Sequence, residues 1–303
     1  MDLASGGRAP AVTRPSSVPA RSRPDSELDA DLARWQDADD SPAVPLVGVL
    51  GAPTVRAAGP APASREAWYA EVVVHLALHP QGVTAEQVCD DLSASPESVD
   101  EAMEQVRAWT GTDRRVRPPA PFVSASDGRH RLRGHLTDWE LLERLRTRGR
   151  ARAAASKPGA LADYRSALKL VRGPALHPHP ADGYGWVTRD SRRLDRHILR
   201  SVVATAHETV DLALASDDTA TAQRAAELAR KVDTGHAFDR PLTDLMRVAH
   251  ARSNPAEVQR LAGVLLELRG VEVAEELAPA TFHVVDGLLP DGVTRPAGRR
   301  AAR

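Results

Sequence analysis

The chain has 303 residues, of which 42% are hydrophobic, and its formal net charge is −1. This length predicts roughly two domains of about 150 residues each, with enough apolar content for real cores. The near-neutral charge excludes a global basic field, so any binding to nucleic acid has to come from a local basic patch. Few aromatic residues and many Ala, Leu, Arg and Glu residues favour helix over sheet, and we therefore expect a mainly α protein.

Cysteine content and hydropathy limit the cellular setting. The one cysteine, Cys89, excludes an internal disulfide. The chain does not start with a charged and then apolar signal sequence, and it has no apolar run of roughly 18 residues. We therefore expect a cytoplasmic protein without membrane spans.

Both ends of the chain differ in composition from the middle. Residues 1–43 alternate Pro, Ser, Ala, Arg and Asp with almost no large apolar side chains. Such a segment buries too little surface to offset the entropy of ordering, which predicts a disordered tail. Residues 290–303, which contain four arginines, predict a second flexible tail.

The ordered part begins near Val44 with a short strand, a Gly-Ala-Pro turn and a second strand up to residue 56. A helix follows over residues 65–79, with Ser64 as its expected N-cap, and the Pro80-Gln81-Gly82 sequence ends it. Its apolar side recurs at helical spacing. The residues on that side are Trp68, Val72 and Leu76, with His79 at the next position.

Two further helices have clear capping signals. Thr84 and Gln87 form a capping box that opens a helix to about Leu92. Ser95 caps the next helix, which has Pro96 at its first position and ends at Gly111. Three residues separate the two helices, which fits a helix-turn-helix. The inward stripe of the second helix consists of Val99, Met103 and Val106.

Two short strands around Asp127-Gly128, over residues 122–132, complete the pattern of a winged helix. The second half of the chain is helical. We expect helices over residues 137–154, 160–173, about 188–215, 218–232, 240–253 and 255–269. Alternating helices of this length suggest tetratricopeptide-like hairpins, with a period of roughly 34 residues.

The stretch from Leu46 to about Leu289 resembles a family of actinobacterial transcriptional activators. These proteins join an OmpR-type winged-helix domain to a helical bacterial transcriptional activation domain, which is tetratricopeptide-like. The resemblance lies in the joint order of LVGVLGAPTV, VVHLALHPQGVTAEQVCDDL, SPESVDEAMEQVRAWTG, DGRHRL, ALADYRSALKLVRGPAL and GYGWV. It implies a winged-helix domain over residues 44–135 and a helical activation domain over residues 136–289.

The resemblance implies binding to double-stranded DNA, but the charges of the winged helix divide unusually. Residues 84–111, around the expected recognition helix, contain seven carboxylates and one arginine. Residues 113–133, around the wing, contain six arginines and two aspartates. Carboxylates near phosphate oppose binding, so we expect the wing to lead any contact with DNA. The candidate DNA-binding residues are Ser98, Arg107, Arg114, Arg115, Arg117, Arg129 and Arg131.

Two functions remain open from the sequence. The first is a transcription regulator whose wing contacts DNA and whose helical repeats bind a protein partner, such as the transcription machinery. The second is a protein-interaction scaffold that keeps the fold without binding DNA, and whose acidic helix docks a basic partner. In both cases the arginines of the wing have an alternative role, which is to pair with the acidic helices.

Signals for an enzyme are weak. His177, His179 and Asp182 lie in a Pro-rich loop without the spacing of a metal site on an ordered element. Cys89 lies on an apolar helix face, which predicts a packed and inert thiol. No glycine-rich nucleotide motif occurs. We therefore expect a non-enzyme without cofactor or metal, in which Tyr184 and Trp186 hold their loop on the helical domain.

Overall fold

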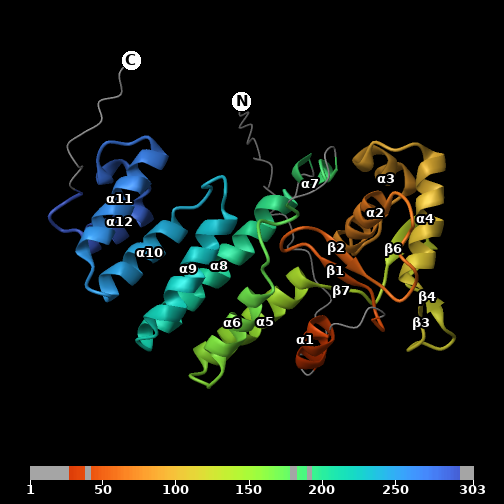
Figure 1. Cartoon of the computed structure of the whole chain (residues 1–303), viewed down its shortest axis with the longest axis horizontal. Helices are drawn as coiled ribbons and strands as arrows, with labels where there is room; N and C mark the ends of the chain where they lie inside the picture. The colour runs from red at the N-terminus through yellow and green to blue at the C-terminus, as the bar shows by residue number, and fades with distance from the viewer. Residues whose placement is uncertain (1–26, 38–41, 178–182, 190–192, 294–303) are drawn as a thin grey trace, which may run out of the picture.

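The computed structural model describes residues 27–37, 42–177, 183–189 and 193–293. A winged helix occupies one end of an elongated molecule, and helical hairpins extend from it to the other end (Figure 1). The architecture is mainly α, as predicted. None of the described helices is long and apolar enough to cross a membrane.

The winged helix opens with a small sheet. Strands β1 (Leu46–Gly48) and β2 (Thr54–Arg56) form the expected hairpin, and β7 (Leu136–Thr137) pairs with β1 in parallel. The register places Val47 opposite Val55 on one side and Thr137 on the other. The expected domain boundary after residue 135 therefore lies immediately before the third strand of this sheet.

Helices α2 (Glu66–Leu78), α3 (Ala85–Leu92) and α4 (Pro96–Thr110) follow. The capping box is present, since the Gln87 N–H donates to Thr84 Oγ1 over 3.1 Å and the Thr84 N–H donates to Gln87 Oε1 over 3.0 Å. Ser95 caps α4 through the Ser98 N–H. The expected cap of α2 is wrong: its N-cap is Arg65, in the left-handed region at φ 54° and without a capping side chain.

Strands β5 (Val123–Ser126) and β6 (Arg129–Leu132) form the predicted wing around Asp127 and Gly128. A second small hairpin, β3 (Thr112–Asp113) and β4 (Ala120–Pro121), links α4 to the wing. The wing folds back on the helix-turn-helix, because Val83 and His130 exchange backbone hydrogen bonds of 3.0 and 2.7 Å. The wing is thus tied to the turn between α2 and α3.

The helical half consists of hairpins that stack side by side. In α5, Gly149 leaves room for the ring of Tyr164 from α6, which a Cβ at Gly149 would meet at 3.1 Å. The arginines Arg146 and Arg150 of α5 bind Glu208 of α8, which connects the first hairpin to the next. The helices are α5 (Asp138–Ala154), α6 (Ala160–Lys169), α7 (Trp186–Arg189), α8 (Leu194–Ala215), α9 (Thr219–Val232), α10 (Arg240–Ala251), α11 (Pro255–Arg269) and α12 (Pro279–Leu288), with a 3-10 turn η2 (Ala274–Glu276) before α12.

Two expectations about these helices are wrong in part. The single helix expected from about residue 188 is instead the short α7 followed by α8, which begins at Leu194 after Arg193 in the left-handed region. The sequence pattern also missed α12, which packs through Val285 into a separate core with α10 and α11. The predicted tail from residue 290 lies mostly outside the described residues.

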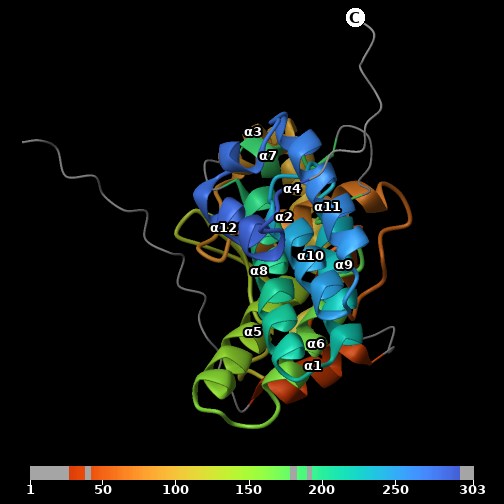
Figure 2. The ribbon, with the colours of Figure 1, turned by 90° about the vertical axis from the view of Figure 1, so that its left-hand side faces the viewer.

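The expectation of a disordered tail over residues 1–43 is wrong for Leu28–Gln36, which form helix α1. Leu28 is fully buried, and the buried carboxylate of Asp31 accepts a 2.7 Å hydrogen bond from Arg144 of α5. Figures 1 and 2 both show α1 beside α5. Leu28, Leu32 and Trp35 repeat at helical spacing, which indicates this helix. The composition of residues 1–43 as a whole, which is typical of disorder, obscured this pattern.

One hydrophobic core crosses the boundary between the two halves. It runs from the sheet and α2–α4 into α5, α6 and the start of α8, where Ile198 is fully buried. The first residue of α5, Asp138, is also fully buried and accepts the N–H groups of Val49 (2.8 Å) and Leu50 (3.0 Å). Burial raises the pKa of the Asp138 carboxyl, while these N–H donors and Arg172 oppose that shift.

A second buried carboxylate joins the halves further along the chain. Glu71 of α2 accepts the Tyr184 backbone N–H (2.5 Å) and the Trp186 indole N–H (3.1 Å) through its Oε1 atom. Burial and the charge of Glu71 raise the pKa of the Tyr184 hydroxyl. Tyr184 and Trp186 are buried and hold their loop in place, as expected. They hold it on α2 of the winged helix, however, whereas we expected the helical domain.

Replacing Glu71 should weaken the attachment of the Tyr184–Trp186 loop to α2. In Glu71→Ala, two buried donors lose their acceptor, and each unsatisfied group costs about 1–3 kcal/mol. We expect the free energy of unfolding in urea to fall by at least about 2 kcal/mol. Glu66→Ala, an exposed change on the same helix, should cost less than about 1 kcal/mol. Equal losses in the two variants would contradict this role of Glu71.

Candidate nucleic-acid interface

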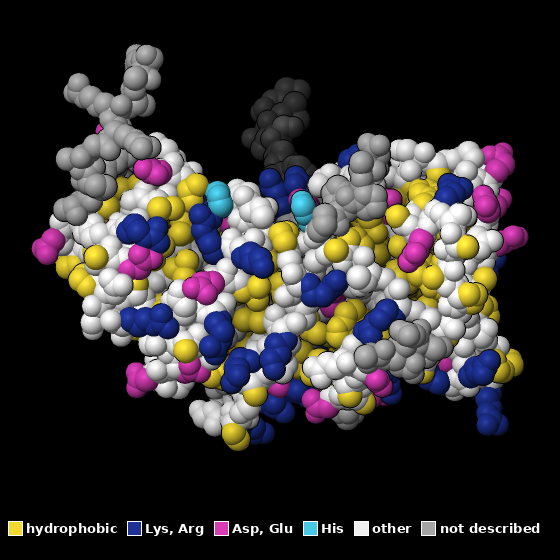
Figure 3. Space-filling model, in the orientation of Figure 1, with side chains coloured by type: hydrophobic (Ala, Val, Ile, Leu, Met, Phe, Trp, Pro, Cys, Tyr) yellow, Lys and Arg dark blue, Asp and Glu magenta, His cyan; other side chains and the backbone are white. Residues whose placement is uncertain are grey.

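The exposed face of α4 is acidic. Val99, Ala102, Met103 and Val106 bury the opposite face. The carboxylates Glu97, Asp100, Glu101 and Glu104 are exposed. Figure 3 shows acidic side chains along the edge of the molecule over α3 and α4, and basic side chains below them over the β3–β4 hairpin. The winged helix is therefore dipolar along α4.

Not all four carboxylates point in one direction. Glu101 faces α2, where it lies 3.4 Å from the Tyr69 hydroxyl and 3.7 Å from an Arg65 guanidinium nitrogen. Glu97 sits in the first turn of α4, where hydrogen bonds from its own backbone and Ser95 lower the pKa of its carboxyl. Glu97 is therefore anionic at neutral pH, and with Asp100 and Glu104 it defines the outward face of α4.

Two of the predicted contact residues lie on α4. Ser98 is half-buried, and its hydroxyl lies 3.2 Å from Ser95 Oγ, within the cap of the helix. Arg107 is half-buried, and burial, followed by the charge of Arg107, lowers the pKa of His130 on β6. Neither residue is as exposed as the carboxylate residues of α4.

The two predicted residues of the wing are engaged by the protein itself. Arg129 Nη1 donates to the Gly82 carbonyl over 3.0 Å, and Arg131 Nε donates to the Gln81 carbonyl over 3.0 Å. Arg131 also donates to Ser126 Oγ over 2.5 Å. These arginines bind the turn between α2 and α3, and Arg129 also lies 3.4 Å from Gln87 Oε1 of α3. Among the described residues neither forms an ion pair with a carboxylate of α3 or α4, as the alternative role would require. They position the wing, and they offer less guanidinium surface to a phosphate than arginines without such hydrogen bonds would.

The remaining predicted arginines lie on the β3–β4 hairpin. Arg115 forms a two-pronged pair with Asp113, with Nε–Oδ1 and Nη2–Oδ2 distances of 2.8 Å, and this pairing raises the pKa of Arg115. Arg114 and Arg117 are exposed, and within the described part of the chain neither makes an ion pair. Arg133, just after the wing, is exposed as well. The structure thus separates Arg114 and Arg117 from the arginines of the wing.

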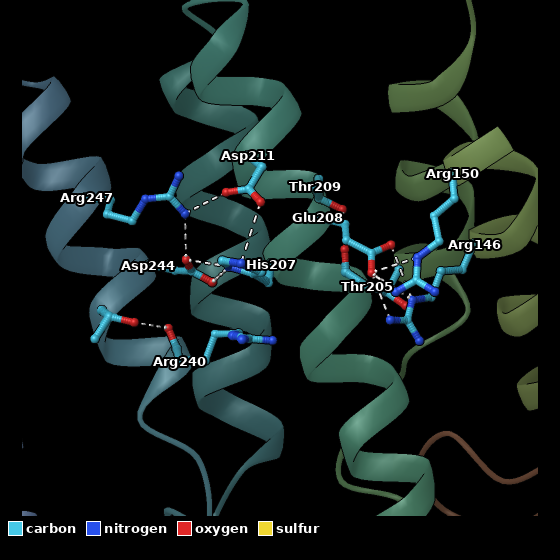
Figure 4. Close-up of polar contacts among 11 residues, drawn as sticks. Arg146, Arg150, Thr205, His207, Glu208, Thr209, Asp211, Arg240, Asp244 and Arg247 are labelled. Carbon is cyan, nitrogen blue, oxygen red and sulfur yellow. Dashed lines mark hydrogen bonds and ion pairs between the residues drawn. The ribbon is translucent and has the colours of Figure 1, made fainter. Parts of the chain in front are cut away.

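A second candidate surface is a groove in the helical half, which we call the α8–α10 groove. It has a volume of about 780 Å³, and Ala204, Phe238 and Ala280 supply part of its apolar lining. In it, Asp244 accepts from His207 Nδ1 over 2.9 Å and from Arg247 over 3.1 Å (Figure 4). The His207–Asp244 contact, together with an ion pair of 2.6 Å between Arg247 and Asp211, fixes α8 against α10.

The same groove carries basic groups that this network does not use. Arg200 and Arg240 also line the groove, and among the described residues they form no ion pair. Arg269, by contrast, binds Asp239 over 2.5 Å. With four arginines and three aspartates in its lining, the groove combines apolar walls with two available guanidinium groups. This combination suits an extended segment that carries a carboxylate.

The candidate enzymatic groups are not assembled in the described residues. His177 is exposed, whereas His179 and Asp182 lie outside the described residues. Cys89 is half-buried and packs against the main core, in agreement with the expectation of a packed thiol.

Comparison with known proteins supports the fold. No protein-family model and no curated protein matches the chain. Among solved structures, Mycobacterium tuberculosis EmbR in complex with a low affinity phosphopeptide matches with a TM-score of 0.60 and 16% sequence identity. The match covers 83% of this chain and 66% of that chain, so the similarity extends over slightly less than two thirds of the length of EmbR.

The binding of Arg129 and Arg131 to the α2–α3 turn has a measurable consequence. In Arg131→Ala, the wing loses a hydrogen bond to Gln81, and we expect the opening free energy of the Val83 and His130 amides to fall by about 1 kcal/mol. Hydrogen exchange measures this change directly. Arg133→Ala, with an exposed side chain, should leave both amides unchanged. Unaltered exchange in Arg131→Ala would show that Arg131 does not hold the wing.

Proposed function

We propose that the chain is a transcription-regulator-like protein that works through protein contacts. In this proposal the winged helix presents its acidic α4 face to a basic partner surface, and the α8–α10 groove receives a segment of a protein partner. The fold shared with EmbR and the order of motifs in the sequence support the regulator-like part of the proposal.

The observation that carries the proposal is the charge of α4. Glu97, Asp100 and Glu104 are all exposed on the face that a recognition helix would place in the major groove. A carboxylate can accept a hydrogen bond from a cytosine amino group, a contact worth about 1–3 kcal/mol, but three carboxylates close to phosphates repel DNA. The same face is complementary to a surface rich in Lys and Arg.

A second candidate function is binding to DNA led by basic groups outside α4. The observation that favours it is the exposure of Arg114, Arg117 and Arg133. Exposed arginines bind backbone phosphates without reading sequence, so such binding would be weak and strongly dependent on salt. Arg129 and Arg131 contribute less to this candidate than expected, because they bind backbone carbonyls.

Fluorescence anisotropy with a random DNA duplex tests the two candidates. For the full chain we expect no saturable binding at about 100 mM salt, because repulsion by α4 offsets the few exposed arginines. Saturable binding at this salt concentration that Arg114→Ala and Arg117→Ala weaken at least tenfold would instead support the second candidate.

Charge reversal on α4 is the matched experiment. The triple change Glu97→Lys, Asp100→Lys and Glu104→Lys should raise affinity for the duplex at least tenfold, since each change replaces repulsion by a phosphate contact. The control reverses three exposed carboxylates in the helical half, Glu272→Lys, Glu275→Lys and Glu276→Lys, which alters net charge equally. The same gain in both variants would mean that α4 does not face the duplex.

The protein contacts have a test of their own. Partners retained by the immobilised full chain should elute with increasing salt, because the proposed contact on α4 is electrostatic. Glu97→Gln with Asp100→Gln and Glu104→Gln should lose one set of these partners, and Arg200→Glu with Arg240→Glu another. The triple control at Glu272, Glu275 and Glu276, changed to Gln, should retain both sets. Identical partners for all variants would contradict the proposal.

A further inference from the structure

His75 of α2, His79 directly after the end of α2 and Asp91 of α3 form a cluster that neither proposed surface uses. His75 and His79 are one helical turn apart, and each of the three side chains of His75, His79 and Asp91 offers a ligand atom within 4.8 Å of the others. His75 Nε2 lies 2.8 Å from Asp91 Oδ2. We propose that this cluster is a binding site for a divalent transition-metal ion, with zinc as the best fit.

Hydrogen bonding prepares His79 as a ligand. Its Nδ1 atom lies 2.7 Å from the carbonyl oxygen of His75. A carbonyl oxygen only accepts, so Nδ1 carries the proton and Nε2 keeps its lone pair. Histidines that bind metals typically donate their second N–H to a backbone carbonyl or a carboxylate in this way. The α2 backbone thus fixes the tautomer that a metal requires.

The three ligand atoms, which lie within 4.8 Å of one another, have to rearrange to hold an ion. Zinc lies about 2.0–2.2 Å from nitrogen and oxygen ligands, so two ligands in a tetrahedral site are about 3.4 Å apart. The 2.8 Å separation of His75 Nε2 and Asp91 Oδ2 has to widen by about half an ångström, and the proton between these two atoms has to move to Nδ1 or leave when the ion binds. Because the Asp91 side chain is 40% exposed, it can move outward by this amount. His75, which is fully buried, provides the fixed part of the site.

The surroundings close the site on one side and leave it open on the other. The Trp186 ring packs edge-on against His75, with centroids 4.6 Å apart, and lies 5.7 Å from the His79 ring. The partly exposed Asp91 marks the open side, where water or a partner's side chain can complete the coordination. Two imidazoles, one carboxylate and an open position suit Zn²⁺ and its first-row neighbours better than Mg²⁺ or Ca²⁺, which prefer oxygen ligands.

From the position of the cluster, a bound metal would influence the contact between the helix-turn-helix and the helical half. An ion would bind α2 to α3 next to Trp186, which Glu71 holds on α2. Arg189 of α7 donates to the Asp91 carbonyl oxygen over 2.7 Å, so the helical half contacts the end of α3 as well. Occupancy would therefore stabilise the helix-turn-helix together with its contact to the helical half.

Titration of the metal-free full chain with Zn²⁺ tests the site. We expect one ion per chain in calorimetry, with a Kd in the micromolar range or tighter. His79→Gln and Asp91→Asn should each weaken binding at least tenfold, since each removes a ligand. The matched controls are Asp90→Asn, on the exposed side of α3, and His250→Gln, exposed on α10; both should bind Zn²⁺ like the unaltered chain.

Co²⁺ provides a second readout, which reports the ion at the site directly. In the unaltered chain, bound Co²⁺ should give a visible absorption band and quench the fluorescence of the nearby Trp186. Trp186→Phe should keep the absorption band and lose the quenching. The inference is overturned if the unaltered chain binds neither ion, if His79→Gln and Asp91→Asn bind as tightly as the controls, or if Trp186→Phe shows undiminished quenching.

Discussion

A buried carboxylate on the winged helix determines how the two halves of this protein fit together. Glu71 receives the N–H groups of Tyr184 and Trp186, which are far away in sequence and belong to the loop before α8. A buried charge is costly unless donors surround it, so this carboxylate requires the loop to dock on α2. Asp138 acts similarly at the other edge of the boundary, where it accepts from Val49 and Leu50. Between these points, the winged helix and the first helices of the helical half share one hydrophobic core.

Local signals predicted the winged helix well. Thr84 with Gln87, Ser95 with Pro96, and Asp127 with Gly128 each determine a cap or a turn within a few residues, and the structure contains all three. Contacts between segments that are distant in the chain could not be predicted from the sequence. Nothing near Arg129 or Arg131 indicates that their partners are carbonyls of the α2–α3 turn, and nothing near Trp186 points to Glu71. Helix α1 was missed because its apolar residues lie within a segment whose composition is typical of disorder.

In α4, the residues that determine the fold and the residues that determine the surface charge point to different functions. The capping and packing residues of α4 support the fold of a DNA-reading helix, whereas its exposed carboxylates would repel a phosphate backbone. Because a fold accommodates many functions, the surface of the site has to decide the function. An acidic α4 face, wing arginines bound internally, and a groove with two available guanidinium groups together favour protein partners.

The central claim is that the winged helix and the first helical hairpins are one cooperative unit. Native-state hydrogen exchange at increasing denaturant measures it most directly, because it reports the opening free energy of each element. The buried amides of α2, such as that of Val73, and of α8, such as that of Val202, should converge on one global opening free energy. Opening of α2 at a free energy more than about 1 kcal/mol below that of α8 would contradict the claim, since the winged helix would then unfold by itself.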